Sequence, residues 1–177
     1  MKIPLEIQKI RDPDGTSHFR ALVSFQDAIA NTSQSQNLIQ IQKEYAQLVS
    51  SCQKSLERIW SSRQLMADSR LQWKLANEIY SFIKLTEKAG YVFANVSEAL
   101  SRDIGMSKSQ LGYLIKFRTY YPSLKQVFKE INWSKYREIL DIRNSEKRKI
   151  CEQKILSREI KTDHDIRIFK KGSIGHH

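Results

Sequence analysis

Apolar and polar residues follow two different periods along this chain of 177 residues. Near the N-terminus they alternate in two runs, which are Ile3, Leu5 and Ile7, and then Phe19, Ala21, Val23 and Phe25. The turn sequence Asp12-Pro13-Asp14-Gly15 separates these runs, so the pattern predicts a β-hairpin over residues 2–25. From residue 38 onwards apolar residues recur at steps of three and four, which is typical of helices. We therefore expect a mostly α-helical fold with an N-terminal β-hairpin.

The longest helical pattern forms one apolar seam over about three heptads. Its members are Leu38, Ile41, Tyr45, Leu48, Cys52, Leu56 and Ile59. The other side of this helix is rich in Gln, Ser and Lys, so we expect it to bury one side only. The seam must then meet either a copy of itself in a dimer or the next helix of the same chain, which the pattern places at about residues 67–88. Both alternatives are open at this point.

Residues 96–117 have the spacing of a helix-turn-helix. Leu100 and Ile104 share one face of the first helix, and Gly105 follows as a C-cap that tolerates positive φ. Ser107 is placed to cap the second helix. That helix is expected to bury Leu111, Leu114 and Ile115. The alternative interpretation is a pair of consecutive amphipathic helices, which are common in any helical protein.

Polar residues on the outer side of this second helix form a candidate surface for reading DNA. We expect base contacts from Ser107, Lys108, Ser109, Gln110 and Tyr113. Within this set, Gln110 suits adenine and Lys108 suits guanine. Candidate phosphate contacts, which fix orientation without reading sequence, come from Lys116, Arg118, Lys135, Arg137 and Arg143.

Shorter helices are predicted in the last third of the chain, after the break at Pro122. We expect one from Ser123 to about Glu130, one capped by Asn132 or Ser134, one opened by Ser145 and one capped by Thr162. The chain then divides into a hairpin arm (1–32), a long helical region able to dimerise (33–90), and a helix-turn-helix domain (91–171). Residues 172–177 look like a linker and a partial affinity tag.

The positive charge is concentrated in the half that holds the helix-turn-helix. The net charge is +11, and residues 96–171 carry 18 Lys and Arg against 10 Asp and Glu, compared with 12 against 9 in residues 1–95. A charge that served solubility alone would be spread more evenly, whereas a phosphate-binding region concentrates it.

Cysteine usage and hydropathy favour a cytoplasmic protein. Cys52 and Cys151 have no CxxC or His spacing beside them, so neither a disulfide framework nor a zinc site is indicated. No apolar run approaches the roughly 20 residues that span a bilayer. We therefore expect a location in the cytoplasm, associated with the nucleoid or a plasmid, and no membrane partner.

Residues 104–171 resemble the DNA-binding domain of the ParB and KorB family of partition proteins. The resemblance rests on three stretches, IGMSKSQLGYLIKF, INWSKYREILDI and SEKRKICEQKIL. It implies a helix-turn-helix braced on DNA by several short helices, and a partition ATPase as a possible partner. The same region is also similar to the helical N-terminal domain found ahead of some PD-(D/E)XK nucleases, through the sequences around Phe117 to Pro122 and Trp133 to Arg137.

The carboxylates that a nuclease would use lie in helical sequence. Asp141 and the stretch Glu159-Ile160-Lys161 would have to surround a metal on adjoining strands. The consecutive residues Asp163, His164 and Asp165 do not face one another on a helix, and helix capping accounts for the two acids. We therefore predict no enzyme activity, no cofactor and no metal.

These observations together predict a sequence-specific double-stranded DNA-binding protein that acts in plasmid or chromosome partition or in transcriptional control. We expect a homodimer, because a single helix-turn-helix with about five phosphate contacts usually needs two copies to bind tightly. Two alternatives remain, which are a DNA-recruitment module of a nuclease system and a helical oligomerisation scaffold without DNA specificity.

Overall fold

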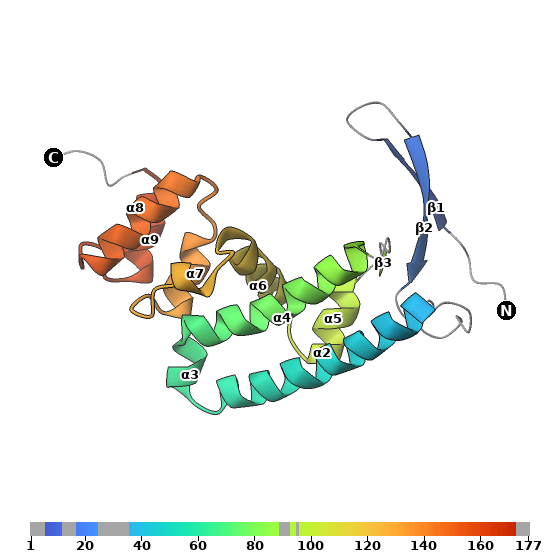
Figure 1. Cartoon of the computed structure of the whole chain (residues 1–177). Helices are drawn as coiled ribbons and strands as arrows, with labels where there is room; N and C mark the ends of the chain where they lie inside the picture. The colour runs from blue at the N-terminus through green and yellow to red at the C-terminus, as the bar shows by residue number, and fades with distance from the viewer. Residues whose placement is uncertain (1–5, 12–16, 25–35, 89–92, 95, 173–177) are drawn as a thin grey trace. The chain divides into compact units, whose positions relative to one another are not determined.

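The structure is a computed structural model that describes residues 6–11, 17–24, 36–88, 93–94 and 96–172 (Figure 1). The described part is mostly helical, as predicted. Its α-helices are α2 (Gln36–Trp60), α3 (Arg63–Ala67), α4 (Ser69–Lys88), α5 (Val96–Ile104), α6 (Lys108–Tyr120), α7 (Trp133–Ile139), α8 (Ser145–Leu156) and α9 (Asp163–Lys170). The predicted turn at residues 12–15 and residues 173–177 of the predicted tag (172–177) lie outside the described residues.

Three strands form a small sheet in the order β1-β2-β3. Strand β1 (Glu6–Arg11) pairs antiparallel with β2 (Ser17–Ser24), with Ile7 opposite Ala21. Strand β2 pairs in parallel with the two-residue strand β3 (Phe93–Ala94). A third strand was not expected from the sequence, because two residues carry no detectable period.

The chain forms two compact units, each built from two separate stretches. Unit 1 comprises residues 1–53 and 79–111, and unit 2 comprises residues 54–78 and 112–177. This division differs from the consecutive segments expected from the sequence. The physical reason is that α2, α4 and α6 each contribute residues to both units.

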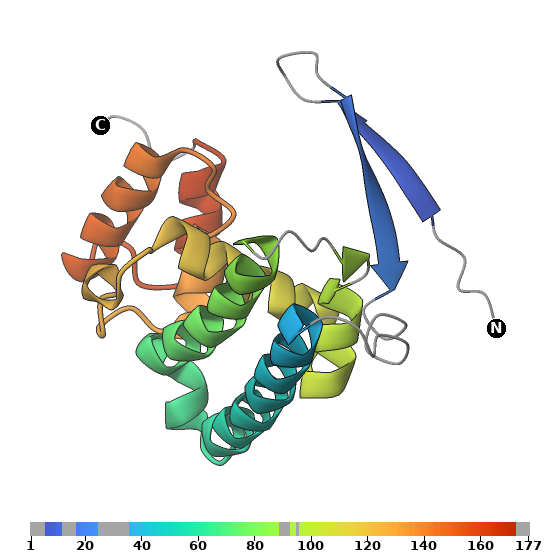
Figure 2. The ribbon, with the colours of Figure 1, turned by 45° about the vertical axis from the view of Figure 1, so that its right-hand side comes forward.

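In unit 1 the apolar seam of α2 is buried within the single chain. Ile41, Leu48 and Cys52 are buried, and the ring of Tyr45 lies 5.6 Å from that of Phe82 on α4. The first part of α2 lies beside the last part of α4 in both views (Figures 1 and 2). The described residues of the seam in unit 1 therefore pack against a helix of their own chain, and the homodimer stays a prediction.

Two hydrogen bonds within unit 1 join helix α5 to helix α2. The hydroxyl of Tyr45 donates to the carboxylate of Asp103 at 2.5 Å, and Nε2 of Gln53 donates to the backbone oxygen of Asp103 at 2.8 Å. Because both bonds end on Asp103, they fasten the last turn of α5 to α2.

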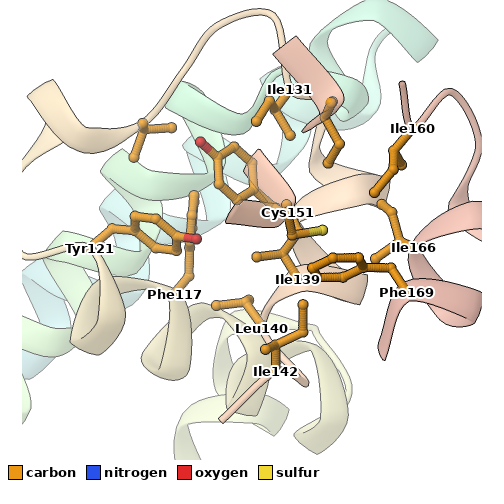
Figure 3. Close-up of a cluster of buried hydrophobic side chains, with 13 residues drawn as sticks. Phe117, Tyr121, Ile131, Ile139, Leu140, Ile142, Cys151, Ile160, Ile166 and Phe169 are labelled. Carbon is orange, nitrogen blue, oxygen red and sulfur yellow. The ribbon is translucent and has the colours of Figure 1, made fainter. Parts of the chain in front are cut away.

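Unit 2 is organised around a cluster of aromatic rings (Figure 3). The ring centroid of Phe117 lies 4.9 Å from that of Tyr136, 5.2 Å from that of Tyr121 and 5.1 Å from that of Trp133. Edge-to-face and tilted contacts at these distances stabilise beyond the area they bury. Aliphatic residues complete this core, namely Val127, Ile131, Ile139, Leu140, Ile142, Ile155, Ile160 and Ile166.

One predicted helix is much shorter than expected. Instead of a helix to Glu130, residues 124–126 form a single 3₁₀ turn, η1 (Leu124–Gln126). Ser123 and Gln126 cap this turn reciprocally, and the backbone becomes extended at Val127. The N–H of Phe128 then donates to the hydroxyl of Tyr136 at 2.9 Å, so a tertiary hydrogen bond replaces the helical one.

Side-chain caps set the starts of the last helices. Asn132 caps α7 and Thr162 caps α9, both among the predicted caps. Ser145 opens α8 as predicted, and the residue before it, Asn144, is the cap, because its side chain accepts from the N–H of Lys147 at 2.9 Å.

Glu152 is a carboxylate in the core of unit 2. Its side chain accepts a hydrogen bond from the hydroxyl of Tyr121, and Cys151 beside it is also buried. Burial raises the pKa of Glu152, while the Tyr121 hydrogen bond acts in the opposite direction. Sequence patterning gave no indication of this group, because its position in a charged helix looks like any solvated glutamate.

Candidate nucleic-acid interface

Helix α5 ends in a tight turn that depends on Gly105. This residue has φ of +83°, a left-handed conformation that side chains disfavour. Its N–H donates to the backbone oxygen of Arg102, and the N–H of Met106 donates to that of Ser101 at 2.8 Å. These two bonds make a Schellman motif, and the buried side chain of Met106 supplies the apolar contact that accompanies it. The turn was predicted, but the role of Met106 was not.

Helix α6 begins with a complete capping box. Oγ of Ser107 accepts from the N–H of Gln110 at 3.1 Å, and Oε1 of Gln110 accepts from the N–H of Ser107 at 2.9 Å. Ser107, Lys108, Ser109 and Gln110 are all exposed, whereas Leu111 directly behind them is fully buried. The start of α6 is therefore a rigid, exposed polar turn anchored on the apolar core of unit 1.

The box changes what Gln110 can do. A bidentate contact with adenine uses both the oxygen and the nitrogen of the side-chain amide. In this structure the oxygen already accepts the Ser107 N–H. Gln110 can therefore present its Nε2 donor while the box is closed, and it can make the bidentate pair only by sharing or opening the cap.

Lys108 is held by an acid of the preceding helix. Its Nζ lies 2.9 Å from Oε1 of Glu98, and both side chains are more than half exposed. An ion pair this exposed contributes little to folding. It nevertheless places a carboxylate next to a residue expected to contact bases.

In unit 2, Tyr113, one of the expected base contacts, is not fully exposed. It is half-buried and packs against the aromatic core, and the guanidinium of Arg137 lies 5.1 Å from the centre of its ring. The contact orients Arg137, which is itself exposed. Tyr113 thus supports a basic side chain.

Two of the expected phosphate contacts are already engaged with residues of unit 2. Lys116 is half-buried, and its Nζ lies 3.5 Å from the carboxylate of Asp141. Arg118 is half-buried, with Nε donating to Oδ1 of Asn77 at 2.7 Å and its guanidinium 5.3 Å from the Trp73 ring. Arg118 therefore fastens α6 to α4, and its assignment to the DNA face is not supported.

The remaining expected phosphate contacts lie on α7 and just after it. Arg137 and Arg143 are exposed, and Lys135 is half-buried. Arg148, which the sequence did not single out, stacks on the Tyr120 ring at 3.8 Å and donates to the backbone oxygens of Ile142 and Arg143, each at 2.8 Å. It thereby holds the backbone that carries Arg143.

The acids considered for catalysis are occupied in other ways. Glu159 pairs with Lys154, and Asp141 pairs with Lys116 and Lys170. Asp163 accepts from the hydroxyl of Ser134, and Asp165 accepts from the N–H groups of Thr162 and Lys161. Within the described residues, no group of three or more His, Cys, Asp or Glu could hold a metal ion.

None of the described helices has the length and apolar character needed to cross a membrane.

Comparisons of the chain with protein-family models, curated proteins and solved structures find no match.

Proposed function

We propose that this chain binds double-stranded DNA in a sequence-specific manner, with α5 and α6 acting as a helix-turn-helix. The observation that carries the proposal is the exposed first turn of α6, where four consecutive polar residues stand on a capped, well-anchored helix start. Side chains at this place in a recognition helix reach base edges in the major groove. Ser107, Lys108, Ser109 and Gln110 are the proposed base contacts.

The basic residues of unit 2 support the same function by a different route. Arg137 and Arg143 are exposed. The Arg137 guanidinium lies over the Tyr113 ring, Arg148 bonds to the backbone oxygen of Arg143, and Lys116 and Lys135 lie in the same unit. Contacts of this kind to phosphates supply affinity and orientation without reading bases. The resemblance to the ParB and KorB family favours plasmid or chromosome partition, with transcriptional control as the second role.

Selection of bound sequences from a pool of random duplexes tests the proposal. We expect one short sequence to be enriched, because four neighbouring polar residues can discriminate several base pairs. A palindrome with half-sites one helical turn apart would indicate two copies on DNA, and a single asymmetric site would indicate one. Recovery of random sequences after several rounds, at a salt concentration where duplex is still bound, would contradict sequence-specific binding.

A further inference from the structure

Helix α3 in unit 2 is held firmly although it buries none of its side chains. Oγ of Ser62 caps its start by accepting from the N–H of Leu65, and Asp68 closes its end. The buried side chain of Gln72 donates to the backbone oxygen of Met66 at 3.3 Å. A five-residue helix is ordinarily stabilised by the apolar side it buries. Here hydrogen bonds stabilise α3 instead, and its apolar side chains, Leu65 and Met66, are not buried.

Large apolar side chains are exposed on α3, at the end of α2 and on the loop whose backbone is hydrogen-bonded to Ser69. Trp60 is 50% exposed, Met66 is 45% exposed and Phe128 is 39% exposed, and Leu65 is half-buried. Two hydrogen bonds hold the backbone of Phe128. Its N–H donates to the hydroxyl of Tyr136, and its carbonyl oxygen accepts from the hydroxyl of Ser69 on α4. Its ring is therefore exposed from a fixed backbone. We call Trp60, Leu65, Met66 and Phe128 the α3 surface.

The segments that carry the α3 surface also hold several basic residues. The same segments expose Arg58, Arg63, Arg70, Lys125 and Lys129. Two acids, Glu57 and Glu130, are exposed there as well, while the carboxylate of Asp68 accepts from the N–H groups of Arg70 and Leu71. Positive charge thus predominates in the exposed segments that carry the α3 surface, and we call these five basic residues its rim.

We propose that the α3 surface docks an acidic amphipathic segment of a partner protein. Such a segment offers apolar side chains to the α3 surface and carboxylates to the rim. Trp, Met and Arg are enriched at protein interfaces, and Met adapts its shape to different partners. A second copy of this chain would bring the same positive rim against itself. The phosphates of duplex DNA would pair with the basic residues of the rim. DNA has no apolar face, however, so Trp60, Met66 and Phe128 would stay exposed.

A library of random 12-residue peptides displayed on phage tests this proposal against the full chain. We expect enriched peptides to combine Asp and Glu with aromatic or aliphatic residues. The same peptides, made synthetically, should bind the wild-type chain less tightly as salt increases, because the rim contributes charge.

Substitutions locate the binding. Met66→Ser and Trp60→Ser should each weaken peptide binding at least about tenfold, which is the size expected when an interface anchor is lost. Ile150→Ser is the matched control, since Ile150 is 46% exposed in the same unit but belongs to α8. Because all three side chains are exposed, circular dichroism should show unchanged folding.

Three results would overturn the proposal. The first is enrichment of peptides that lack acidic residues, or no enrichment of any peptide. The second is peptide binding that Met66→Ser and Trp60→Ser leave unchanged. The third is dependence on these residues of a different interaction, either binding of a labelled 12-nucleotide single strand or self-association in sedimentation. Duplex binding is measured in parallel, so failure of this proposal and failure of DNA binding are separate outcomes.

Discussion

Lys108 at the start of α6 forms an ion pair with Glu98 in the first turn of α5, with 2.9 Å between Nζ and Oε1. The residue proposed to contact guanine is therefore paired with a carboxylate of its own chain before it meets DNA. Binding requires Lys108 to exchange this partner for a base or a phosphate. Glu98 then remains near the polyanion, where it opposes binding of any sequence.

Glu98→Gln should therefore raise the affinity for duplex DNA by a few-fold at low salt. This is roughly the effect expected from removing one exposed charge. Glu87→Gln is the control, because it removes the same charge from a comparable exposed pair with Lys84 on α4. Fluorescence anisotropy with labelled duplex measures both. Equal gains for the two variants would show that only net charge matters and that Glu98 has no special position.

The two glycines of this region should respond to alanine in opposite ways. Gly105→Ala forces a side chain into a left-handed conformation and should cost about 1 to 2 kcal/mol of the free energy of unfolding. Gly112 lies in the middle of α6, where an added Cβ would meet nothing within 4 Å. Gly112→Ala should therefore stabilise by about 0.5 to 1 kcal/mol. Urea denaturation of both variants checks the signs, and destabilisation by Gly112→Ala would mean that α6 packs differently.

Buried Glu152 makes the stability of the chain depend on pH. Its folded-state pKa is raised above the ordinary value of 4.5, so in the window just above 4.5 the folded protein keeps a proton that the unfolded chain has lost. Stability from this group consequently falls as pH rises through that window. Glu152→Gln still accepts from Tyr121 but cannot ionise.

The free energy of unfolding of Glu152→Gln, measured relative to that of wild type, should therefore increase from pH 4 to pH 8. Melting temperatures measured across this range provide the test. An advantage that shrinks as pH rises would contradict the raised pKa, whatever the constant offset between the two proteins.

Arg137 should contribute equally to the binding affinity for every DNA sequence. Arg137→Ala removes a proposed phosphate contact, so it should weaken binding to selected and random duplexes and flatten the slope of log K against log salt by about 0.9. Lys74→Ala, which removes an exposed charge on α4, should leave the slope nearly unchanged. Loss of affinity for the selected duplex alone would mean that Arg137 reads bases.

The elements that depend on local sequence could be predicted. Gly105, Ser107, Asn132 and Thr162 end or start helices through their own backbone and side-chain chemistry, so their positions follow from residue type and spacing. The buried positions of α5 and the start of α6 followed from helical period in the same way. Ile115 is an exception, since it is only half-buried.

The features that depend on tertiary partners could not be predicted. Nothing in the sequence shows that Arg118 turns towards Asn77, since Arg at that spacing would suit an exposed phosphate contact equally well. The helix expected after Ser123 gives way to a single turn because Tyr136 captures the backbone of Phe128. The apolar seam of α2 likewise fits a dimer or a neighbouring helix, and only the packing decides between them.

The central claim, that the first turn of α6 reads DNA, is tested most directly by Gln110→Glu. A glutamate at this position keeps the capping box with Ser107 and places a negative charge at a helix start, so the melting temperature should be unchanged or higher. Gln126→Glu is the matched control, because Gln126 makes the same capping box with Ser123 on η1. Dissociation constants for the selected duplex are measured for both variants at one salt concentration. We predict that Gln110→Glu loses at least about tenfold, or 1.4 kcal/mol, relative to Gln126→Glu. Equal affinities of the two variants would contradict the claim that α6 enters the groove by its first turn.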